Sequence, residues 1–119
     1  MYKQLKAYQK AFELAMNIFE LSKAFPKEER FALTDQMRRS SRSVCANFAE
    51  GYRKRLYPKH FIAKLSDADM ENSESQVWLD FAFACNYITK DKKEELHNES
   101  KEVGKLLGYM IQNSEKFRK

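Results

Sequence analysis

Apolar residues recur every three or four positions along most of the chain, which is the spacing of one face of an α-helix. Two of the three breaks in this pattern contain a proline, Pro26 or Pro58. Each proline disfavours helix in the residue before it and fits the first turn of the helix after it. Asp91 follows the third break and is the expected N-cap of the last helix. The pattern predicts helices over residues 4–24, 28–53, 59–87 and 92–117.

The second predicted helix has a narrow apolar stripe and an arginine-rich back. At about 100° per residue, the members of the stripe fall within roughly 80° of one another. They are Leu33, Met37, Ser40, Val44 and Phe48. Four arginines fall together on the opposite side of the same helix, namely Arg38, Arg39, Arg42 and Arg53. We therefore expect one face of this helix to pack into a core while the other presents a cationic surface.

The first and third predicted helices are apolar over a wider arc. In the first, a row of Leu5, Tyr8, Phe12, Ala15 and Phe19 is widened by Ala11, Leu14, Ile18 and Leu21. In the third, one stripe consists of Phe61, Leu65, Ala68, Leu79 and Phe83, with Asn72 and Gln76 in the same row. A second stripe on its far side consists of Met70, Val77, Trp78, Phe81, Cys85 and Ile88. A helix that is apolar on two sides must be covered on both, so we expect the bundle core to cover one stripe and a neighbouring subunit to cover the other.

Four helices of about 20 to 30 residues with short connectors are typical of an antiparallel, up-down-up-down four-helix bundle. A chain of 119 residues is long enough to bury a hydrophobic core without metal or disulfide support. Residues 1–119 contain no internal repeat and no glycine-rich linker, so we expect a single four-helix-bundle domain. The predicted fold class is all-α, and the uncovered stripe predicts a homo-oligomer.

Charge is unevenly distributed in the middle of the chain, although the net charge is only +5. Residues 30–64 contain nine Lys or Arg and two acids, whereas residues 65–89 contain five acids and no Lys or Arg. The basic block either meets phosphate groups in salt-dependent contacts or pairs with the acidic block within or between subunits. Composition leaves both interpretations open, since a charged helix face is most often simply solvated.

The two cysteines, Cys45 and Cys85, form no C-x-x-C motif and lie among apolar neighbours. Buried free thiols in a reducing compartment are therefore expected, although two cysteines also permit a disulfide. The N-terminal residues lack the apolar segment of a signal peptide. No apolar run approaches the roughly 18 residues of a membrane span, and we expect a cytoplasmic protein with no membrane contact.

No arrangement of residues indicates a catalytic, cofactor or metal site. The three glycines match neither a dinucleotide-binding motif nor a phosphate-binding loop. Glu94 and His97 form one Glu-x-x-His pair, whereas a di-iron bundle needs two such pairs on facing helices. Ser40, Ser41 and Ser43 have no base at a matching spacing. We expect no enzymatic activity, no cofactor and no metal.

Three polar residues have predicted structural roles. Asn47 lies at the edge of the apolar stripe of the second helix, and Glu50 lies about 60° further round. We expect this pair to lock the helix to a neighbour through hydrogen bonds rather than to perform chemistry. Glu74 lies among the second stripe of the third helix and is expected to pair with an Arg or Lys, because an unpaired buried carboxylate is costly.

The predicted nucleic-acid contacts are the cations of the second helix and of its C-terminal end. They are Arg38, Arg39, Arg42, Arg53, Lys54 and Arg55. Tyr52 and Tyr57 are interleaved with the last of these, and aromatic rings beside cations can stack on unpaired bases. Tyr52 continues the apolar stripe, so a core position is the favoured interpretation for it.

A set of motifs gives the chain a resemblance to a known family. The residues that carry it are Leu5, Ala11 and Leu14; Phe25-Pro26 with Glu29-Arg30; Leu33, Gln36, Arg39 and Ser43; and Asn47-x-Ala49-Glu50-Gly51. The sequence resembles the four-helix-bundle proteins encoded in intervening sequences of bacterial 23S rRNA genes. In the third helix Ala68, Glu74 and Leu79 fit the family pattern, whereas Met70 and Glu71 stand where the family usually has Gly-Ser.

This resemblance implies a four-helix bundle that assembles as a ring-like homopentamer. Relatives include the accessory protein of diversity-generating retroelements, a basic pentamer that works with a reverse transcriptase and nucleic acid. The resemblance implies no enzymatic activity. It supports the fold more strongly than it supports any function.

Two hypotheses for the function follow. In the first, the protein is a non-enzymatic, oligomeric binding protein whose cationic surface engages structured RNA or another nucleic acid. In the second, it is a protein–protein scaffold, for example an accessory subunit of a polymerase such as a reverse transcriptase, and the same arginines meet acidic protein surfaces. Competition by RNA and the dependence of binding on salt distinguish the two.

Overall fold

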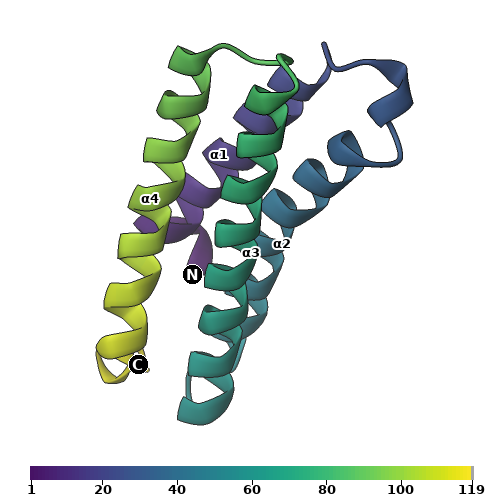
Figure 1. Cartoon of the computed structure of the whole chain (residues 1–119). Coiled ribbons are helices and arrows are strands. Elements are labelled where there is room, and N and C mark those ends of the chain that lie inside the picture. Colours follow the sequence, from purple (N-terminus) through teal and green to yellow (C-terminus); the bar gives the residue numbers. More distant parts are fainter. Residues whose placement is uncertain (119) are drawn as a thin grey trace.

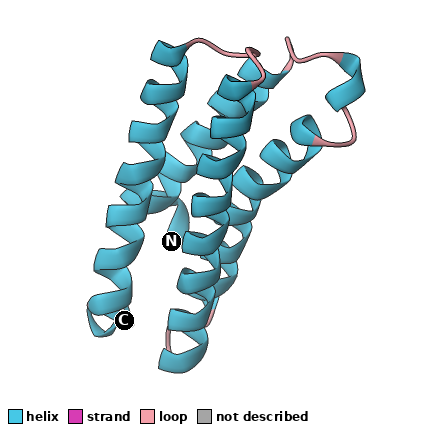
Figure 2. Ribbon diagram, viewed as in Figure 1, coloured by secondary structure: helices cyan, strands magenta, loops and turns pink. Residues whose placement is uncertain are grey.

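In the computed structural model, which describes residues 1–118, four long α-helices lie side by side as a bundle (Figure 1). They are α1 (Lys6–Ser22), α2 (Leu33–Arg53), α3 (Pro58–Ala84) and α4 (Lys90–Gln112). Three short 3-10 helices accompany them, η1 (Tyr2–Gln4), η2 (Lys27–Glu29) and η3 (Ser114–Phe117). Short loops join these elements, and residues 1–118 contain no strand (Figure 2). The predicted all-α four-helix bundle is confirmed.

The second helix begins five residues later than predicted. Residues 28–32 were expected to be helical, but they form η2 and a turn in which Ala32 has φ −125° and ψ −106°. The carboxylate of Glu29 accepts a hydrogen bond from the Leu33 backbone N–H (3.4 Å), so it satisfies a free donor at the start of α2. A side chain four residues upstream therefore takes the place of the usual N-cap.

The third helix ends at Ala84, three residues earlier than predicted, in a left-handed turn. Asn86 has φ 63°, a conformation that asparagine tolerates better than most residues. The Asn86 N–H donates to the Phe83 carbonyl and the Tyr87 N–H donates to the Ala82 carbonyl, both at 2.9 Å. This is the Schellman arrangement, which satisfies the last carbonyls of the helix.

The N-cap of α4 is Thr89, and the prediction of Asp91 was wrong. The Thr89 hydroxyl accepts a hydrogen bond from the Lys92 N–H (3.1 Å), while Asp91 lies within the first turn. Its negative charge there still favours the positive end of the helix dipole. At the other end of the helix, residues 114–117 form η3 and do not extend α4 as predicted.

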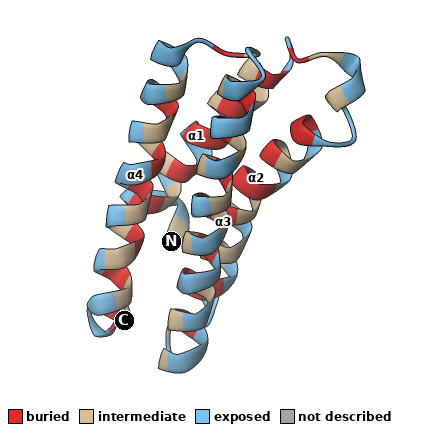
Figure 3. Ribbon diagram, viewed as in Figure 1, coloured by how far each residue is buried: buried red, intermediate tan, exposed pale blue. Residues whose placement is uncertain are grey.

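The core consists of two apolar clusters, one toward each end of the bundle, and buried residues line the facing sides of the helices (Figure 3). The first cluster includes Phe48, Phe61 and Leu107, and the second includes Ile18 and Leu79. All five residues of the predicted α2 stripe are buried, as expected. Between the two clusters, the middle of the bundle is filled by polar side chains.

A buried polar layer separates the two clusters. Asn72 Nδ2 donates to the Ser100 carbonyl (2.8 Å), and Ser100 Oγ donates to Asn72 Oδ1 (2.8 Å). Gln76 Nε2 donates to Ser100 Oγ at 2.9 Å. Between α2 and α3, the hydroxyls of Ser40 and Ser75 share a hydrogen bond of 2.8 Å. Each of these side chains in the polar layer therefore has a hydrogen-bond partner, which avoids the cost of burying an unpaired polar group.

The apolar rows predicted for α1 and α3 were only partly right. In α1 the buried side includes Ala7, Ala11 and Ile18, whereas Phe12 is 51% exposed. In α3 the first stripe is buried at Phe61, Leu65, Ala68 and Leu79. The second stripe faces outward at Met70, Val77, Phe81 and Cys85, while Trp78 is half-buried and Ile88 is buried beyond the helix end. The single chain thus leaves apolar residues of both helices uncovered.

Gly51 brings α2 and α3 into close contact. A Cβ atom at this position would lie 2.9 Å from the Cβ of Lys64 and 3.6 Å from the Phe61 carbonyl oxygen. The Lys64 Cβ is tied to its backbone and cannot swing aside. Gly51 is therefore required by packing between the helices, whereas Gly108 has nothing within 4 Å of such a Cβ.

These two glycines give a matched test of the fold. We expect Gly51→Ala to lower the free energy of unfolding by about 1–3 kcal/mol, because α2 and α3 must move apart. Gly108→Ala should raise it by about 0.5–1 kcal/mol, because alanine favours the helix and meets no neighbour. Urea denaturation followed by circular dichroism measures both. Equal effects of the two substitutions would contradict the close approach at Gly51.

Candidate nucleic-acid interface

Three of the predicted nucleic-acid contacts lie around one open hollow on the outer side of α2. Arg38, Arg39 and Arg42 line it together with Asp35, Ser43 and Ala46. Asp35 places one negative charge among the three positive ones. The hollow therefore has a positive charge that is smaller than the number of arginines suggests.

Arg38 and Arg42 are held against α1. The Arg38 Nε donates to the Ser22 hydroxyl at 2.8 Å, and its guanidinium lies 4.8 Å from the centre of the Phe19 ring. The Arg42 guanidinium lies 5.6 Å from the same ring. Phe19 thus receives cation–π contacts from both arginines. It was predicted as part of the apolar row of α1, and in the structure it is half-buried beneath these two side chains.

Arg39 turns the other way, toward α3. It donates to Gln36 Oε1 at 3.1 Å and lies 3.4 Å from Glu74 Oε1. The expected pairing of Glu74 with an arginine is therefore present. Nearby, the pKa of Glu71 is raised by its partial burial and by the negative charge of Glu74, and Arg39 only partly offsets this rise. The arginines of the predicted cationic face are thus divided between the two neighbours of α2.

Arg53, Lys54 and Arg55 form a separate group. Arg53 lies about 16 Å beyond Arg42 along the helix axis, at 1.5 Å per residue. We call residues 53–60 the basic corner, because here α2 ends and α3 begins. The Arg55 guanidinium lies 4.4 Å from the centre of the Tyr52 ring and donates to the Tyr52 carbonyl at 3.1 Å.

The end of the chain adds to the charge at the basic corner, which sequence reasoning missed. η3 packs against α3, and Phe117 joins the apolar cluster that contains Phe61 near the start of α3. This places Lys116 and Arg118, which flank Phe117, at the same end of the bundle. Glu115 supplies one opposing charge. Phe117 belongs to the apolar pattern of the last helix. This pattern was the signal from which the position of Lys116 and Arg118 could have been predicted.

The motif Asn47-x-Ala49-Glu50-Gly51 contacts α3 through one lysine, Lys64. Lys64 Nζ donates to Asn47 Oδ1 at 3.4 Å and lies 3.5 Å from Glu50 Oε1. Asn47 also donates to the Ser43 carbonyl at 3.0 Å. With Gly51 against the same lysine, these residues form a helix–helix contact of the kind predicted for Asn47 and Glu50.

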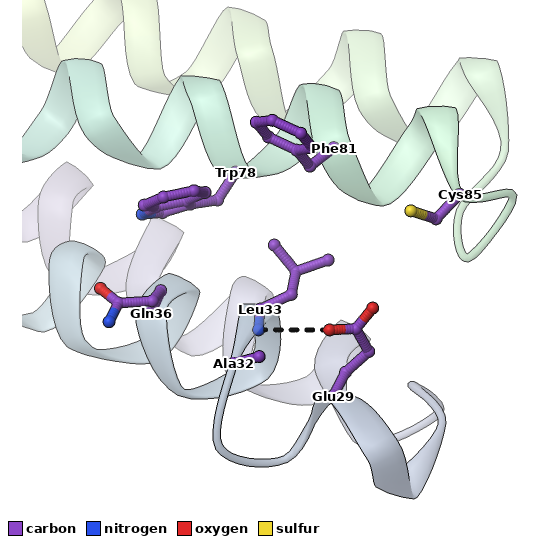
Figure 4. A pocket seen from close by; sticks show the side chains of 7 residues that line it. All are labelled: Glu29, Ala32, Leu33, Gln36, Trp78, Phe81 and Cys85. Carbon is purple, nitrogen blue, oxygen red and sulfur yellow. Dashed lines mark hydrogen bonds between the residues drawn. The ribbon is translucent and has the colours of Figure 1, made fainter.

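A second hollow, lined mostly by apolar residues, lies between the start of α2 and the end of α3 (Figure 4). Leu33 points from α2 toward α3, and the Trp78 ring extends from α3 over Gln36, with Phe81 on the same helix (Figure 4). Glu29 forms its far wall and accepts a hydrogen bond of 2.7 Å from the Tyr87 hydroxyl. This bond, followed by burial, raises the pKa of Tyr87 to about 12.

The two cysteines are free thiols, but only one of them is even partly buried. Cys45 is half-buried, and burial raises the pKa of its thiol to about 11. Cys85 is exposed at the edge of the hollow in Figure 4, so the prediction that it is buried was wrong. The early end of α3 at Ala84 places Cys85 outside the helix and explains the difference.

Residues 1–118 contain neither a cluster of metal ligands nor a membrane-spanning helix. No group of three or more His, Cys, Asp or Glu side chains in this part of the chain is arranged to hold a metal ion. None of its helices is long and apolar enough to cross a membrane. His97, of the single Glu-x-x-His pair, instead lies with its Nε2 2.9 Å from Asp80 Oδ1.

Comparisons with known proteins identify similar sequences and structures. The family model described as 23S rRNA-intervening sequence protein matches residues 3–109. A crystal structure from Bacteroides thetaiotaomicron, of a protein with unknown function from the S23 ribosomal protein family, is similar with a TM-score of 0.80 and 33% sequence identity. The match covers 88% of this chain and 97% of that one. No curated protein matches the chain.

The cysteines predict a difference in reactivity. The rise in the Cys45 pKa from 9.0 to about 11 leaves about 100-fold less thiolate at pH 8 than an unperturbed thiol has. We expect iodoacetamide at pH 8 to alkylate the exposed Cys85 first. Alkylation of Cys45 should accelerate as the pH rises toward 11. Mass spectrometry of the Cys45→Ala and Cys85→Ser variants measures each rate alone, and equal rates at pH 8 would contradict the burial of Cys45.

Proposed function

The chain belongs to the family of 23S rRNA-intervening sequence proteins, and from this premise we propose that it is a non-enzymatic, oligomeric protein that binds structured RNA or another nucleic acid. The observation that carries the proposal is the gathering of Arg38, Arg39 and Arg42 around one open hollow of α2. The basic corner extends the same charge to the end of the bundle. Both surfaces suit a polyanion whose phosphates are spaced along a strand.

The arginines are suited to phosphate by their geometry as well as by their charge. A guanidinium presents a planar set of donors that matches a phosphate group, and such charge-assisted bonds are strong. Arg38 is already held by Ser22 and Phe19, so binding costs it little side-chain entropy. The salt bridge from Arg39 to Glu74 is half-exposed and therefore weak enough to exchange for a phosphate.

The serines beside these arginines support a non-enzymatic role. Ser40 and Ser41 are buried, and both donate to the Met37 carbonyl or to a neighbouring group of the bundle. A hydroxyl used in this way satisfies the core and is withdrawn from solvent. A nucleophilic serine needs an adjacent base and access to a substrate, whereas these two hydroxyls are used in packing between the helices.

Assembly into an oligomer is supported by the outer face of α3. Phe81 is 53% exposed and Met70 is 68% exposed, and with Val77 they form an apolar stripe opposite the core. Uncovered apolar surface of this kind marks contact sites.

A ring is the assembly that two different apolar surfaces favour. Besides the α3 stripe, a hollow between α1 and α2 is lined by Tyr8, Phe12, Met16 and Ala49. The two surfaces lie on either side of α2. A twofold contact covers one surface on each subunit, whereas head-to-tail contacts cover both and close into a ring. We propose that antiparallel bundles associate in this way, as a homopentamer.

The alternative function is that of a scaffold or accessory subunit for a protein partner, such as a polymerase. The same apolar surfaces favour it, because each is able to receive a partner helix. In that case the arginines meet acidic side chains, and RNA competes with the partner only through charge.

Binding of RNA is tested by changing the hollow. We expect Arg38→Glu, Arg39→Glu and Arg42→Glu together to abolish binding to a structured RNA, measured by fluorescence anisotropy at two salt concentrations. For the wild type, affinity should fall steeply as salt rises and depend little on sequence, because phosphate contacts release counterions. The helical circular dichroism signal should be retained.

A matched control carries the same change in charge elsewhere. Lys90→Glu, Lys101→Glu and Lys105→Glu together alter three exposed lysines of α4. This variant should keep most of the wild-type affinity. Equal losses in the two triple variants would show that net charge, not the hollow, determines binding. An absence of binding by the wild type at low salt would refute the proposed function.

Oligomerisation is tested on the α3 stripe. Native mass spectrometry of the wild type should show a closed homo-oligomer of five subunits. Val77→Asp with Phe81→Asp should give a helical monomer, because two carboxylates would be desolvated at the contact. The control, Asn98→Asp with Gln112→Glu, adds the same charge to exposed positions of α4 and should remain oligomeric. A stable wild-type monomer at micromolar concentration would exclude this assembly.

A further inference from the structure

We propose that the basic corner binds an unpaired stretch of nucleic acid by stacking a base on the ring of Tyr57. This inference rests on the proposed function. It specifies that the bound nucleic acid contains a segment of unpaired bases. The α2 hollow recognises phosphates alone, whereas the basic corner adds a contact that only an exposed base can make.

Tyr57 presents its ring to solvent from a rigid backbone. The residue is 60% exposed. Its N–H donates to the Lys54 carbonyl at 2.8 Å, and its carbonyl accepts the Phe61 N–H at 2.9 Å. Pro58 follows as the first residue of α3 and restricts the backbone further. An aromatic ring held in this way loses little freedom when a base stacks on it.

The Tyr57 ring contacts the ring of His60, which helps to fix its position. The His60 ring lies 6.4 Å away, centre to centre, at an interplanar angle of 86°. This T-shaped contact leaves the Tyr57 residue 60% exposed. A base stacked on Tyr57 therefore meets a positioned ring, and His60 is close enough to contact the same nucleotide.

The charged residues near Tyr57 in the sequence are all positive. Residues 51–66 contain five Lys or Arg and no Asp or Glu. Three of them, Arg53, Lys54 and Lys59, are exposed on either side of the ring. Lys116 and Arg118 add to this end of the bundle through the packing of η3. A phosphodiester strand that crosses the basic corner thus meets cations before and after the stacked base.

Other exposed aromatic rings lack this combination. Phe31 is 86% exposed, but its neighbours along the chain include Glu28 and Glu29. Tyr109 is engaged with Lys116, whose Nζ lies 5.5 Å from its ring centre, and with the edge of Phe117. At the opposite end of the bundle, Lys90, Lys92 and Lys93 alternate with acids. Phe12 and Phe81 lie in the two apolar surfaces that are proposed as subunit contacts. Tyr57 is thus an exposed ring with exposed cations on both sides of it in the chain.

The test compares two strands with the same phosphates. One is a fluorescent 12-nucleotide single strand of deoxythymidine, and the other is its abasic analogue, in which every base is absent. We expect the wild type to bind the strand with bases about 5- to 150-fold more tightly, the range that stacking of one base on an aromatic ring provides. Tyr57→Ala should remove this preference, and Tyr57→Phe should retain it because the ring is kept.

The outcomes separate this inference from the proposed function. Equal binding of both strands by the wild type, with loss of binding in the triple arginine variant, would overturn the stacking and leave the proposed function intact. Tyr57→Ala that weakens both strands equally would also overturn it, since the ring would then act without a base. An absence of binding to either strand and to structured RNA at low salt would overturn both. Binding to phosphatidylserine vesicles without any preference for bases would assign the basic corner to a membrane surface instead.

Discussion

The hydrogen bonds between Asn72 and Ser100 are the constraint on which the rest of the structure depends. Two apolar clusters alone would let the helices slide along one another, since apolar contacts are not directional. The Asn72 amide needs the Ser100 carbonyl and hydroxyl at its own level, and Ser40 needs Ser75. A shift of one turn would leave these buried groups without partners, which costs more than the bonds themselves contribute. The polar layer thus sets the register of α2, α3 and α4.

This register determines what the bundle presents on its surface. With Ser40 and Ser75 at one level, Arg39 comes beside Glu74, while Arg38 and Arg42 lie over Phe19 of α1. The same register leaves the far side of α3 without a partner in the single chain. The molecule therefore has surfaces of two kinds. Apolar ones lie on either side of α2, and cationic ones lie on its outer side and at its end.

The two kinds of surface are compatible in one assembly. In the proposed ring, apolar contacts between subunits would cover the α3 stripe and the hollow beside Phe12, whereas the basic corner lies where α2 ends and α3 begins, at one end of the bundle (Figure 1). A ring built in this way repeats the basic corner once per subunit. Several weak contacts with one strand then combine, because each bound subunit raises the effective concentration of the strand at the next.

The sequence by itself determined the number and type of helices, the buried stripe of α2 and the cationic composition of its back, because each of these follows from periodicity along one helix. Periodicity places a residue around its own helix axis but does not say which neighbour lies there. Only the tertiary structure decided that Arg38 and Arg39 turn to different helices, that Phe12 is exposed, and that η3 places Lys116 at the same end of the bundle as the basic corner. Helix ends were missed for a related reason. The start of α2 depends on Glu29, whose carboxylate reaches Leu33 only once the chain has turned, and the end of α3 depends on Asn86 in a left-handed conformation.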